Sequence, residues 1–178
     1  MQKDDIKAII GLGNPGEKHY NNRHNIGFRI LDALAEAHTA YWQEKDNMLT
    51  AEVQHGNRKV ILVKPQTFMN SSSKVLPFLL KKGIKPENIL VVHDELELAL
   101  GVIKIKFGGS AKGHNGLRSI IEVIGKEFYR LCFGIGRPKN KEEVSEYVLS
   151  NFQEDPAELE FQIGKAVTKI GELFDSEK

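Results

Sequence analysis

The sequence has one cysteine, Cys132, and no long apolar run among its 178 residues. A single cysteine excludes a disulfide within the chain, which suits a reducing compartment. No apolar stretch approaches the roughly 18 residues that a membrane-spanning helix needs. The segment from Met1 to Asp5 also lacks the apolar core of a secretory signal peptide. We therefore expect a cytoplasmic protein rather than a secreted or membrane-embedded one.

Internal repeats and linker-like segments are also missing from the chain. Hydrophobic residues make up 40% of it and charged residues 28%, which is ordinary for a soluble globular protein. A chain of this length can bury about 70% of its unfolded surface as one domain. We therefore expect a single domain over residues 1–178.

The net charge of +1 hides two regions of opposite sign. Residues 101–141 contain nine Lys or Arg and two Glu, whereas residues 142–178 contain ten acids and three Lys. Such asymmetry favours an anionic partner that docks on the first region and avoids the second. An ordinary solvated surface would also explain it, so charge alone does not establish a partner.

The most informative stretch begins with a short apolar run, residues 8–10, that leads into a glycine-rich loop. The run predicts a buried strand, and the loop after it is polar and precedes a predicted helix. Open α/β sheets bind ligands at loops that connect the carboxyl end of a strand to the following helix. We therefore expect the active site here.

The same loop, Gly11-Leu12-Gly13-Asn14-Pro15-Gly16, matches the G-x-G-x-x-G dinucleotide fingerprint. That fingerprint needs a helix that opens within the glycines and a second strand that ends in an acid about 20 residues later. Here the next residues are too polar for such a helix, and residues 30–36 have helical spacing. A dinucleotide-dependent oxidoreductase is therefore the disfavoured alternative. Binding of a nicotinamide cofactor would support it.

Hydrophobic periodicity predicts strands that alternate with helices. Strands are expected at residues 8–10, 49–54, 59–64, 89–94, 102–107 and 130–134, and helices at 25–37, 115–124, 141–149 and 156–174. Gly56-Asn57 favours a hairpin between the second and third strands. The run Ser71-Ser72-Ser73 is expected to cap a further helix, because no nucleophile elbow surrounds these serines. The pattern predicts an α/β fold with a single mixed β-sheet and helices on both faces.

Two residues have the character of a general base and its partner. His24 follows the polar loop, and an imidazole with a pKa of about 6.5 can accept a proton at neutral pH. Asp94 ends an apolar run, where a carboxylate can accept the Nδ1 proton of an imidazole and leave Nε2 free. A helix cap for His24 and a structural salt bridge for Asp94 are the alternatives. His19 and His24 have no Cys or carboxylate at ligand spacing, so no zinc site is expected.

Three asparagines, Asn14, Asn70 and Asn115, each lie in a loop after an apolar segment. A carboxamide donates and accepts hydrogen bonds while staying neutral, so it suits an ester carbonyl, a peptide backbone or a ribose. One such donor aimed at a developing oxyanion can contribute roughly 3 kcal/mol. A role in turn formation is the alternative for each asparagine taken singly.

Five sequence blocks follow one another between Ile10 and Pro138. They are Gly11-Leu12-Gly13-Asn14-Pro15-Gly16 with Tyr20, Arg23-His24-Asn25 and Gly27; Thr67-Phe68-Met69-Asn70; His93-Asp94-Glu95-Leu96; Gly113-His114-Asn115-Gly116-Leu117; and Phe133-Gly134-Ile135-Gly136-Arg137-Pro138. In composition and order these blocks resemble the bacterial-type peptidyl-tRNA hydrolase family. The residues after them resemble that family only in length and helical character.

The resemblance implies an esterase that cleaves the bond between a peptide and the 3′-terminal ribose of tRNA. Such an enzyme rescues tRNA from peptidyl-tRNA that is released prematurely during translation. The resemblance further implies that His24 activates the attacking water and that Asp94 orients His24. Asn14 would help to distinguish a blocked amino group from a free one. No cofactor and no metal ion are implied, and a monomer that binds the acceptor stem and 3′ end of tRNA is expected.

The resemblance also implies further contacts with the substrate. The expected contact residues are Tyr20, Phe68, Met69, Asn70, His114 and Asn115, where His114 positions RNA or the loop around it. The lysines in the positive region are expected to contact phosphates, since an enzyme that serves many tRNAs gains nothing from strong base readout. The lysines expected to make these contacts are Lys104, Lys106 and Lys112.

The chain departs from the family pattern in two places. The family's nearly all-glycine loop before His114 is here Gly109-Ser110-Ala111-Lys112, and Cys132 stands where many members have arginine. The first change adds a lysine to the loop, and the second removes one basic contact. Cys132 lies in a strand-like run and is interpreted as a small packed residue, not a nucleophile. An RNA-binding module without activity is the remaining alternative, and the intact His24, Asp94 and Asn14 argue against it.

Overall fold

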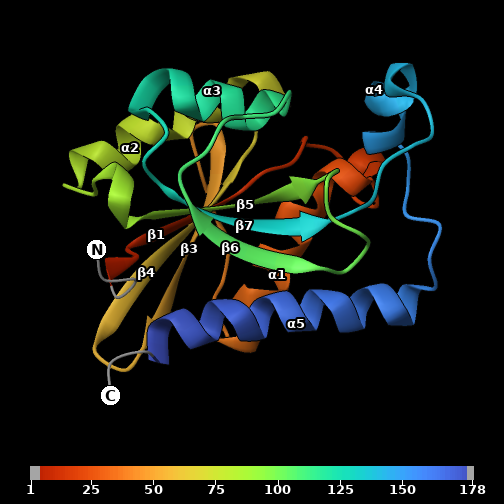
Figure 1. Ribbon diagram of the computed structural model, residues 1–178. Coiled ribbons are helices and arrows are strands. Elements are labelled where there is room, and N and C mark those ends of the chain that lie inside the picture. Colours follow the sequence, from red (N-terminus) through yellow and green to blue (C-terminus); the bar gives the residue numbers. More distant parts are fainter. Residues whose placement is uncertain (1–4, 176–178) are drawn as a thin grey trace.

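Seven strands form a single mixed sheet in the order β2-β3-β4-β1-β5-β7-β6, with helices on both faces (Figure 1). The computed structural model describes residues 5–175. The strands are β1 (Ala8–Gly11), β2 (Gln43–Lys45), β3 (Met48–His55), β4 (Arg58–Pro65), β5 (Ile89–Glu95), β6 (Ile103–Phe107) and β7 (Tyr129–Gly134). The α-helices are α1 (Ile26–Ala37), α2 (Leu76–Lys81), α3 (Asn115–Ile124), α4 (Val144–Val148) and α5 (Pro156–Asp175). This architecture confirms the fold class predicted from the sequence.

Short 3-10 turns connect several of these elements. They are η2 (Glu17–His19), η3 (Arg23–Asn25), η4 (Met69–Val75), η5 (Pro86–Asn88) and η6 (Lys141–Glu143). Two of them, η2 and η3, shape the polar loop between β1 and α1 that the sequence marks as the expected site.

Strand β1 lies at the centre of the sheet, parallel to β4 on one side and to β5 on the other. Strand β7 continues the parallel part beyond β5, whereas β2, β3 and β6 run antiparallel to their neighbours. The chain therefore leaves β1 toward one half of the sheet and later returns to the other half. The carboxyl ends of β1 and β5 meet where this direction changes, which is where open α/β sheets bind ligands.

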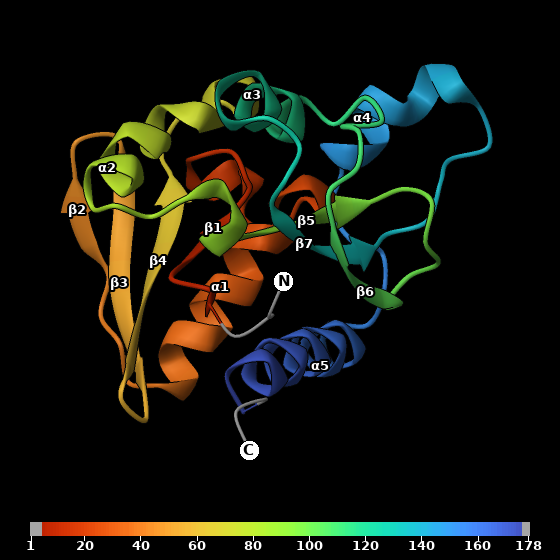
Figure 2. The same cartoon turned by 60° about the vertical axis from the view of Figure 1, so that its left-hand side comes forward.

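Alternate residues of β1 point into two hydrophobic cores, one on each face of the sheet. Ile9 packs in the core that α1 and α5 cover, together with Ile30 and Leu34 of α1. Ile10 packs in the opposite core with Leu117 of α3, under η4, α2 and α3 (Figure 2). The helical spacing predicted for residues 25–37 is thus confirmed as the buried stripe of α1. Within residues 5–175, no helix combines the length and apolarity needed to cross a membrane.

The predicted role of the serine run is wrong. The three serines lie inside η4, and α2 begins after them at Leu76 without a side-chain cap. Ser72 is buried and its hydroxyl donates to the carbonyl of Met69 at 2.7 Å, while Ser119 of α3 accepts the N–H of Ser73 at 3.0 Å. Serine hydroxyls compete for nearby backbone groups. Here Ser72 bonds within η4, whereas Ser73 and Ser119 join η4 to α3, so none of the three serines caps α2.

Strand β2 was not predicted. Its three residues are polar and exposed, so they carry no alternation of apolar and polar positions. The strand exists because it pairs with β3, from Gln43 opposite Thr50 to Lys45 opposite Met48. Edge strands of this kind depend on a neighbour and leave little local signal.

Candidate active site

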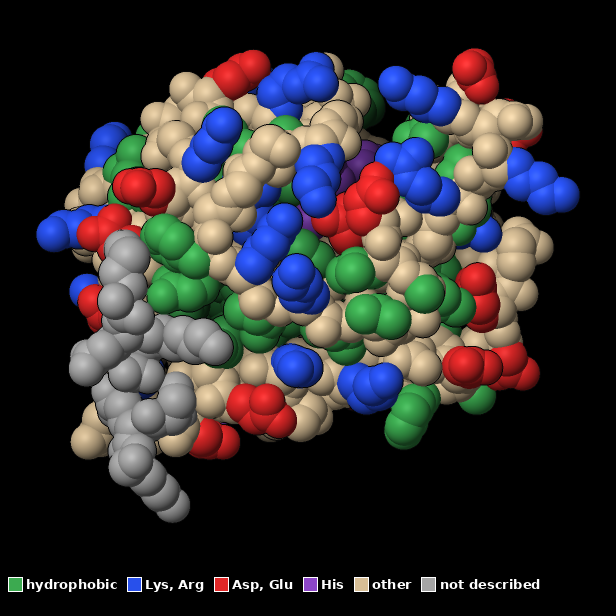
Figure 3. Space-filling view, in the orientation of Figure 1, with side chains coloured by type: hydrophobic (Ala, Val, Ile, Leu, Met, Phe, Trp, Pro, Cys, Tyr) green, Lys and Arg blue, Asp and Glu red, His purple; other side chains and the backbone are tan. Residues whose placement is uncertain are grey.

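A cavity of about 560 Å³ opens at the carboxyl ends of the parallel strands. Its walls come from the loops after β1, β5 and β7, from η4, from the start of α3 and from α4. In Figure 3, histidine is visible on this face between Lys, Arg and acidic side chains. The predicted site residues that line the cavity are Asn14, His24, Phe68, Met69, Asn70, Asp94, Lys106, Lys112, His114 and Asn115. The structure thus brings together residues that are up to about a hundred positions apart in the sequence.

Two glycines bring the start of α1 close to the sheet and so place His24. A Cβ atom on Gly27 would lie 2.5 Å from the backbone nitrogen of Leu12 and 2.5 Å from the carbonyl oxygen of Val92. A Cβ atom on Gly11 would lie 2.5 Å from the carbonyl oxygen of Gly27. Side chains at these positions would push the helix off the ends of β1 and β5. Because the backbone of α1 contacts the ends of β1 and β5, η3 places His24 next to Asp94, the last buried residue of β5.

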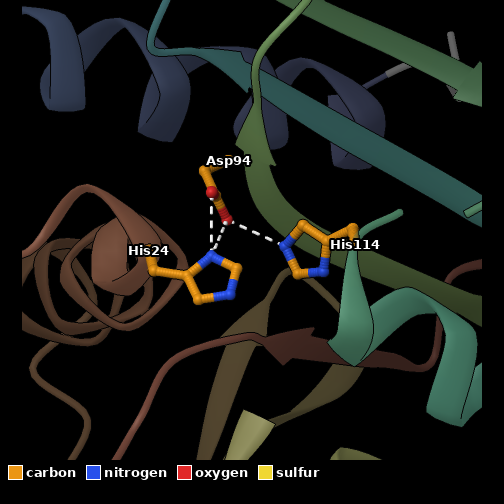
Figure 4. Close-up of side chains that lie close together, drawn as sticks. All are labelled: His24, Asp94 and His114. Atoms are coloured by element: carbon orange, nitrogen blue, oxygen red, sulfur yellow. Dashed lines mark hydrogen bonds and ion pairs between the residues drawn. The ribbon is translucent and has the colours of Figure 1, made fainter. Parts of the chain in front are cut away.

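His24 and His114 both contact the carboxylate of Asp94 (Figure 4). Nδ1 of His24 lies 2.9 Å from Oδ2 and 3.0 Å from Oδ1 of Asp94, and Nε2 of His114 lies 2.8 Å from Oδ1. Asp94 is only 3% exposed, so the two imidazoles take the place of water as its hydrogen-bond donors.

The two imidazoles and the carboxylate shift one another's pKa. Burial would raise the pKa of Asp94, but the charges of His24 and His114 and their hydrogen bonds outweigh it and hold that pKa well below its usual range. Burial likewise opposes charge on His24, yet the negative charge of Asp94 and its hydrogen bond win and raise the pKa of His24 above its ordinary 6.5. Asp94 is therefore an anion at neutral pH, and Nδ1 of His24 donates its proton to it.

The proton of His114 is placed by backbone groups. Its Nδ1 accepts the N–H groups of Gly116 at 3.1 Å and Leu117 at 3.3 Å, which caps α3. Its Nε2 must therefore carry the proton of the neutral ring, and this atom donates to Asp94. The sequence-based role for His114 was to position RNA or the loop, and its contact with Asp94 was not foreseen.

The ring of a third histidine, His93, lies with its centre 5.3 Å from that of His114, and both of its nitrogens have partners. Its Nδ1 lies 2.7 Å from the carbonyl oxygen of Asp94, and its Nε2 lies 3.5 Å from Sγ of Cys132. Burial, helped by the nearby His114, lowers the pKa of His93 to about 3, so the ring is neutral and accepts the thiol proton. Cys132 is buried, which confirms its interpretation as a small packed residue.

His24 thus differs from its two neighbours. Both nitrogens of His114 and both nitrogens of His93 have partners. Within the part of the chain that the structure describes, Nε2 of His24 has no partner, and His24 lines the cavity. An imidazole held at Nδ1 by a carboxylate, with a free Nε2, is arranged to accept a proton from a bound molecule.

His24, Asp94 and His114 also lie close enough together to be considered as a metal site, with their ligand atoms within 4.8 Å of one another. A metal would need lone pairs on the nitrogens that face Asp94. In His114 that nitrogen carries the proton, because Nδ1 accepts from the backbone. The hydrogen-bonding pattern therefore fits a proton-handling site better than a metal centre.

The backbone of Asn14 and its side-chain oxygen are fixed by hydrogen bonds, whereas, within residues 5–175, its side-chain nitrogen is free to bind another molecule. Its Oδ1 accepts the N–H of Met69 at 2.9 Å, its backbone N–H donates to Oδ1 of Asn25 at 2.9 Å, and its carbonyl accepts Nδ2 of Asn25 at 2.8 Å. Nδ2 of Asn14 has no partner among the described residues, and the side chain lines the cavity. The fixed amide can therefore donate two hydrogen bonds to a bound molecule.

Two predicted contact residues, Tyr20 and Lys104, are not part of the cavity wall. Tyr20 is 50% exposed, and its ring centre lies 5.4 Å from the guanidinium of Arg29. His19, one position earlier, lines the cavity instead, with Nδ1 2.8 Å from Oδ1 of Asn22. The turn η2 sends neighbouring side chains in different directions, and sequence spacing gave no sign of this.

Two arginines also line the cavity: Arg130, which sequence reasoning missed, and Arg137, which stands in the last of the family blocks. Arg130 is fully buried, and its guanidinium donates to the carbonyls of Gly109 and Ser110, at 2.8 Å for Ser110. It therefore holds the loop in which the chain departs from the family's glycine pattern. Arg137 forms an ion pair with Glu97 across the cavity mouth. The only sequence signal for Arg130 was the positive charge of residues 101–141.

Comparison with known proteins gives consistent matches. A family model described as peptidyl-tRNA hydrolase matches residues 8–177. The chain is 46% identical over 171 residues to the peptidyl-tRNA hydrolase of Sulfurihydrogenibium sp. (strain YO3AOP1), covering 95% of this chain and 89% of that protein. It is 48% identical over 149 residues to that of Dinoroseobacter shibae, covering 83% of this chain and 63% of that protein. The crystal structure of peptidyl-tRNA hydrolase from Acinetobacter baumannii superposes with a TM-score of 0.88 at 36% identity, covering 98% of this chain and 91% of that one.

Proposed function

The chain belongs to the peptidyl-tRNA hydrolase family and is an enzyme that hydrolyses peptidyl-tRNA, and we propose that His24 is the general base of this reaction. The observation that carries the proposal is the free Nε2 of His24, the one imidazole nitrogen around Asp94 that has no partner in residues 5–175. Asp94 holds the opposite nitrogen and keeps the ring in the tautomer that accepts a proton.

The reaction then proceeds in two steps. A water molecule at Nε2 of His24 gives its proton to the imidazole while its oxygen attacks the ester carbonyl carbon. The new imidazolium is stabilised by the negative charge of Asp94. The tetrahedral intermediate collapses, the bond to the ribose oxygen breaks, and that oxygen takes the proton from Nε2. The products are a tRNA with an intact terminal ribose and a peptide whose new carboxylic acid then loses its proton to solvent.

The pH dependence of turnover tests this assignment. We expect kcat/KM to rise with pH through a midpoint above 6.5, because only the neutral imidazole accepts a proton and Asp94 raises the pKa of His24. No second transition is expected down to the usual pKa of a carboxylate, since Asp94 is already an anion there. Hydrolysis of N-acetylaminoacyl-tRNA, measured from about pH 5 to 8.5, gives the midpoint. A pH-independent rate over that range would remove His24 from the base role.

Asn14 is proposed to recognise the blocked end of the substrate. Its Oδ1 is occupied by the N–H of Met69, so the group that meets the substrate is Nδ2, a neutral donor. Such a donor suits the carbonyl of a peptide or N-acyl group, or the oxyanion that forms during attack. It offers no negative charge to the ammonium group of a free aminoacyl-tRNA.

Asn14→Asp tests this role with almost no change in shape. One carboxylate oxygen can still accept the N–H of Met69, while the other replaces the donor with a negative charge. We expect the ratio of kcat/KM for N-acetylaminoacyl-tRNA to that for aminoacyl-tRNA to fall by about tenfold or more, because lost donors of this kind cost roughly 3 kcal/mol. An unchanged ratio would mean that Asn14 does not set this selectivity.

We propose that the acceptor stem of tRNA lies along the positive region, with its phosphates near β6. Lys104 and Lys106 alternate with apolar residues on β6, so both project from one face of this edge strand, and Lys106 lines the cavity. Lys106 lies opposite Arg130 in the sheet, which brings two positive charges together at the cavity wall. Lys112, in the loop before His114, extends the same surface.

Replacing Lys104 and Lys106 together with alanine should weaken the binding of full-length tRNA. Each phosphate contact adds about 0.7 to 0.9 to the slope of log affinity against log salt, so the slope should flatten by about 1 to 2. KM should rise while kcat stays close to that of the parent. The matched control is Lys165 and Lys169 on α5, which change the net charge equally but lie outside the cavity. Equal salt slopes for both double variants would contradict the proposed path of the RNA.

A further inference from the structure

Helix α4 forms one wall of the cavity, yet it has no buried residue of its own. Val144, Ser145, Val148 and the following Leu149 line the cavity. In Figure 1 the helix lies at the edge of the molecule and is joined to β7 and α5 by extended segments. A short helix with so little burial needs an attachment elsewhere to hold a fixed position.

The attachment comes from Arg23, the residue before His24. Arg23 is 6% exposed and turns away from the cavity. The central carbon of its guanidinium lies 4.1 Å from the ring centre of Tyr147 in α4 and 5.9 Å from that of Phe152. Its Nη1 also donates to the carbonyl of Tyr147 at 3.3 Å and to the hydroxyl of Ser150. One side chain therefore contacts α4 and the segment that follows it.

Hydrogen bonds along the backbone continue the same junction. The N–H of Arg23 donates to the carbonyl of Ser150 at 3.0 Å, and the N–H of Phe152 donates to the carbonyl of Asn21 at 3.2 Å. Nδ2 of Asn22 donates to Oδ1 of Asn151 at 2.9 Å. The residues just before His24 are thus paired with the residues just after α4. The hydroxyl of Tyr147 also donates to the carbonyl of Ile135 at 2.6 Å, which ties α4 to the residue that follows β7.

Arg23 is an unusual choice for a purely structural contact. No carboxylate forms an ion pair with it within residues 5–175, and its buried Nε has no partner. Burying a guanidinium without an acid is costly, and an apolar side chain of similar size would fill the space at lower cost. The planar cation is suited to one arrangement, stacked on Tyr147 and bonded to Ser150, so it specifies where α4 lies relative to His24.

We propose that Arg23 is a positioning residue of the reaction, which holds the α4 wall at a fixed distance from His24. The inference rests on the proposed role of His24 and concerns how the substrate is held against it. When α4 is anchored, a substrate bound between Val148 and the base meets a preformed surface. When the anchor is lost, part of the binding free energy is used to order α4 before the ester reaches Nε2.

The experiment compares Arg23→Met with Arg29→Met. Arg29 is a matched control because it is also largely buried, pairs with Glu160 and stacks near Tyr20, and is absent from the cavity wall. We expect Arg23→Met to raise KM for N-acetylaminoacyl-tRNA by about tenfold, with kcat and the midpoint of the pH profile close to the parent's. Arg29→Met should leave KM unchanged even at an equal loss of thermal stability.

A second arm uses Tyr147, which does not line the cavity. Tyr147→Leu removes the ring and should raise KM as Arg23→Met does. Tyr147→Phe keeps the ring under Arg23 and loses only the hydroxyl that donates to Ile135, so it should raise KM much less. The Arg23→Met/Tyr147→Leu double variant should have no larger effect than either change alone, because both remove one contact. Hydrogen exchange of residues 144–150 should speed up in Arg23→Met and in Tyr147→Leu, while exchange in β1 and β5 stays slow.

Several results would overturn the proposal. An unchanged KM in Tyr147→Leu would do so even if Arg23→Met did not fold. Additive effects in the double variant, or a fall in kcat without a rise in KM, would place the action of Arg23 elsewhere. These outcomes are distinct from failure of the proposed function, which would appear as full activity in a variant that lacks His24.

Discussion

His24→Ala should lower kcat by about 10² to 10⁴-fold, the usual contribution of a positioned general base. The expected loss follows from geometry, because neither His93 nor His114 has a free ring nitrogen to replace His24. KM should change little, since the amides and cations of the cavity remain. Single-turnover hydrolysis of N-acetylaminoacyl-tRNA gives the effect on the chemical step directly.

The fold should survive this change. His24 contributes one imidazole to Asp94, and the bond from His114 remains. His38→Ala is the control, because His38 bonds the carbonyl of Leu34 at the end of α1 and is absent from the cavity wall. It should leave kcat unchanged. Near-normal turnover by a folded His24→Ala protein would exclude the proposed base.

Asp94→Asn should be nearly as damaging, with kcat lower by about 10² to 10⁴-fold, as for carboxylates that orient a catalytic histidine. Both His24 and His114 donate to the carboxylate, whereas an amide has one accepting oxygen and a donating NH₂ group. One imidazole must then lose its bond or change its tautomer. Without the negative charge, burial alone acts on His24, so its pKa should fall and the midpoint of the pH profile should move downward.

The downward shift separates this role from a structural one. Asp32→Asn is the control, since Asp32 forms an ion pair with Lys64, which is largely buried, outside the cavity. That variant should lose stability while keeping both kcat and the pH midpoint of the parent. If Asp94→Asn loses stability in the same way and keeps its kcat, then Asp94 is a structural residue and the mechanism proposed for His24 fails.

The free energy of unfolding should fall at acidic pH partly because of His93. Burial lowers the pKa of His93 in the folded protein to about 3, below the ordinary value of 6.5, so the unfolded chain binds more protons between these two pH values. This residue therefore favours folding fully above 6.5 and progressively less as the pH falls toward 3. The raised pKa of His24 acts in the opposite sense, since its contribution is present below 6.5 and is lost as the pH rises through its folded value.

Much of the fold was predictable because its signals are local. Continuous apolar runs predicted β1 and β5 as buried strands, and helical spacing predicted α1, α3 and α5. The order of strands and helices then left few arrangements other than a mixed sheet with two covered faces. The predictions failed where partners decide the structure. The exposed residues of β2 become a strand only beside β3, and the serines of η4 bond to α3 instead of capping α2.

The same distinction between local signals and contacts with distant partners applies to the candidate site. Residue types, loop positions and family blocks were sufficient to propose His24, Asp94 and Asn14 from the sequence, because the side chain of each has the chemistry that its proposed role needs. Which nitrogen of each histidine is free depends on groups far away in the chain, such as the N–H groups of α3 and the thiol of Cys132. The same holds for His19 in place of Tyr20, and for Arg23, whose partners lie more than 120 residues later. Hydrogen-bond direction and side-chain placement are properties of contacts between distant segments, so only the tertiary structure could decide them.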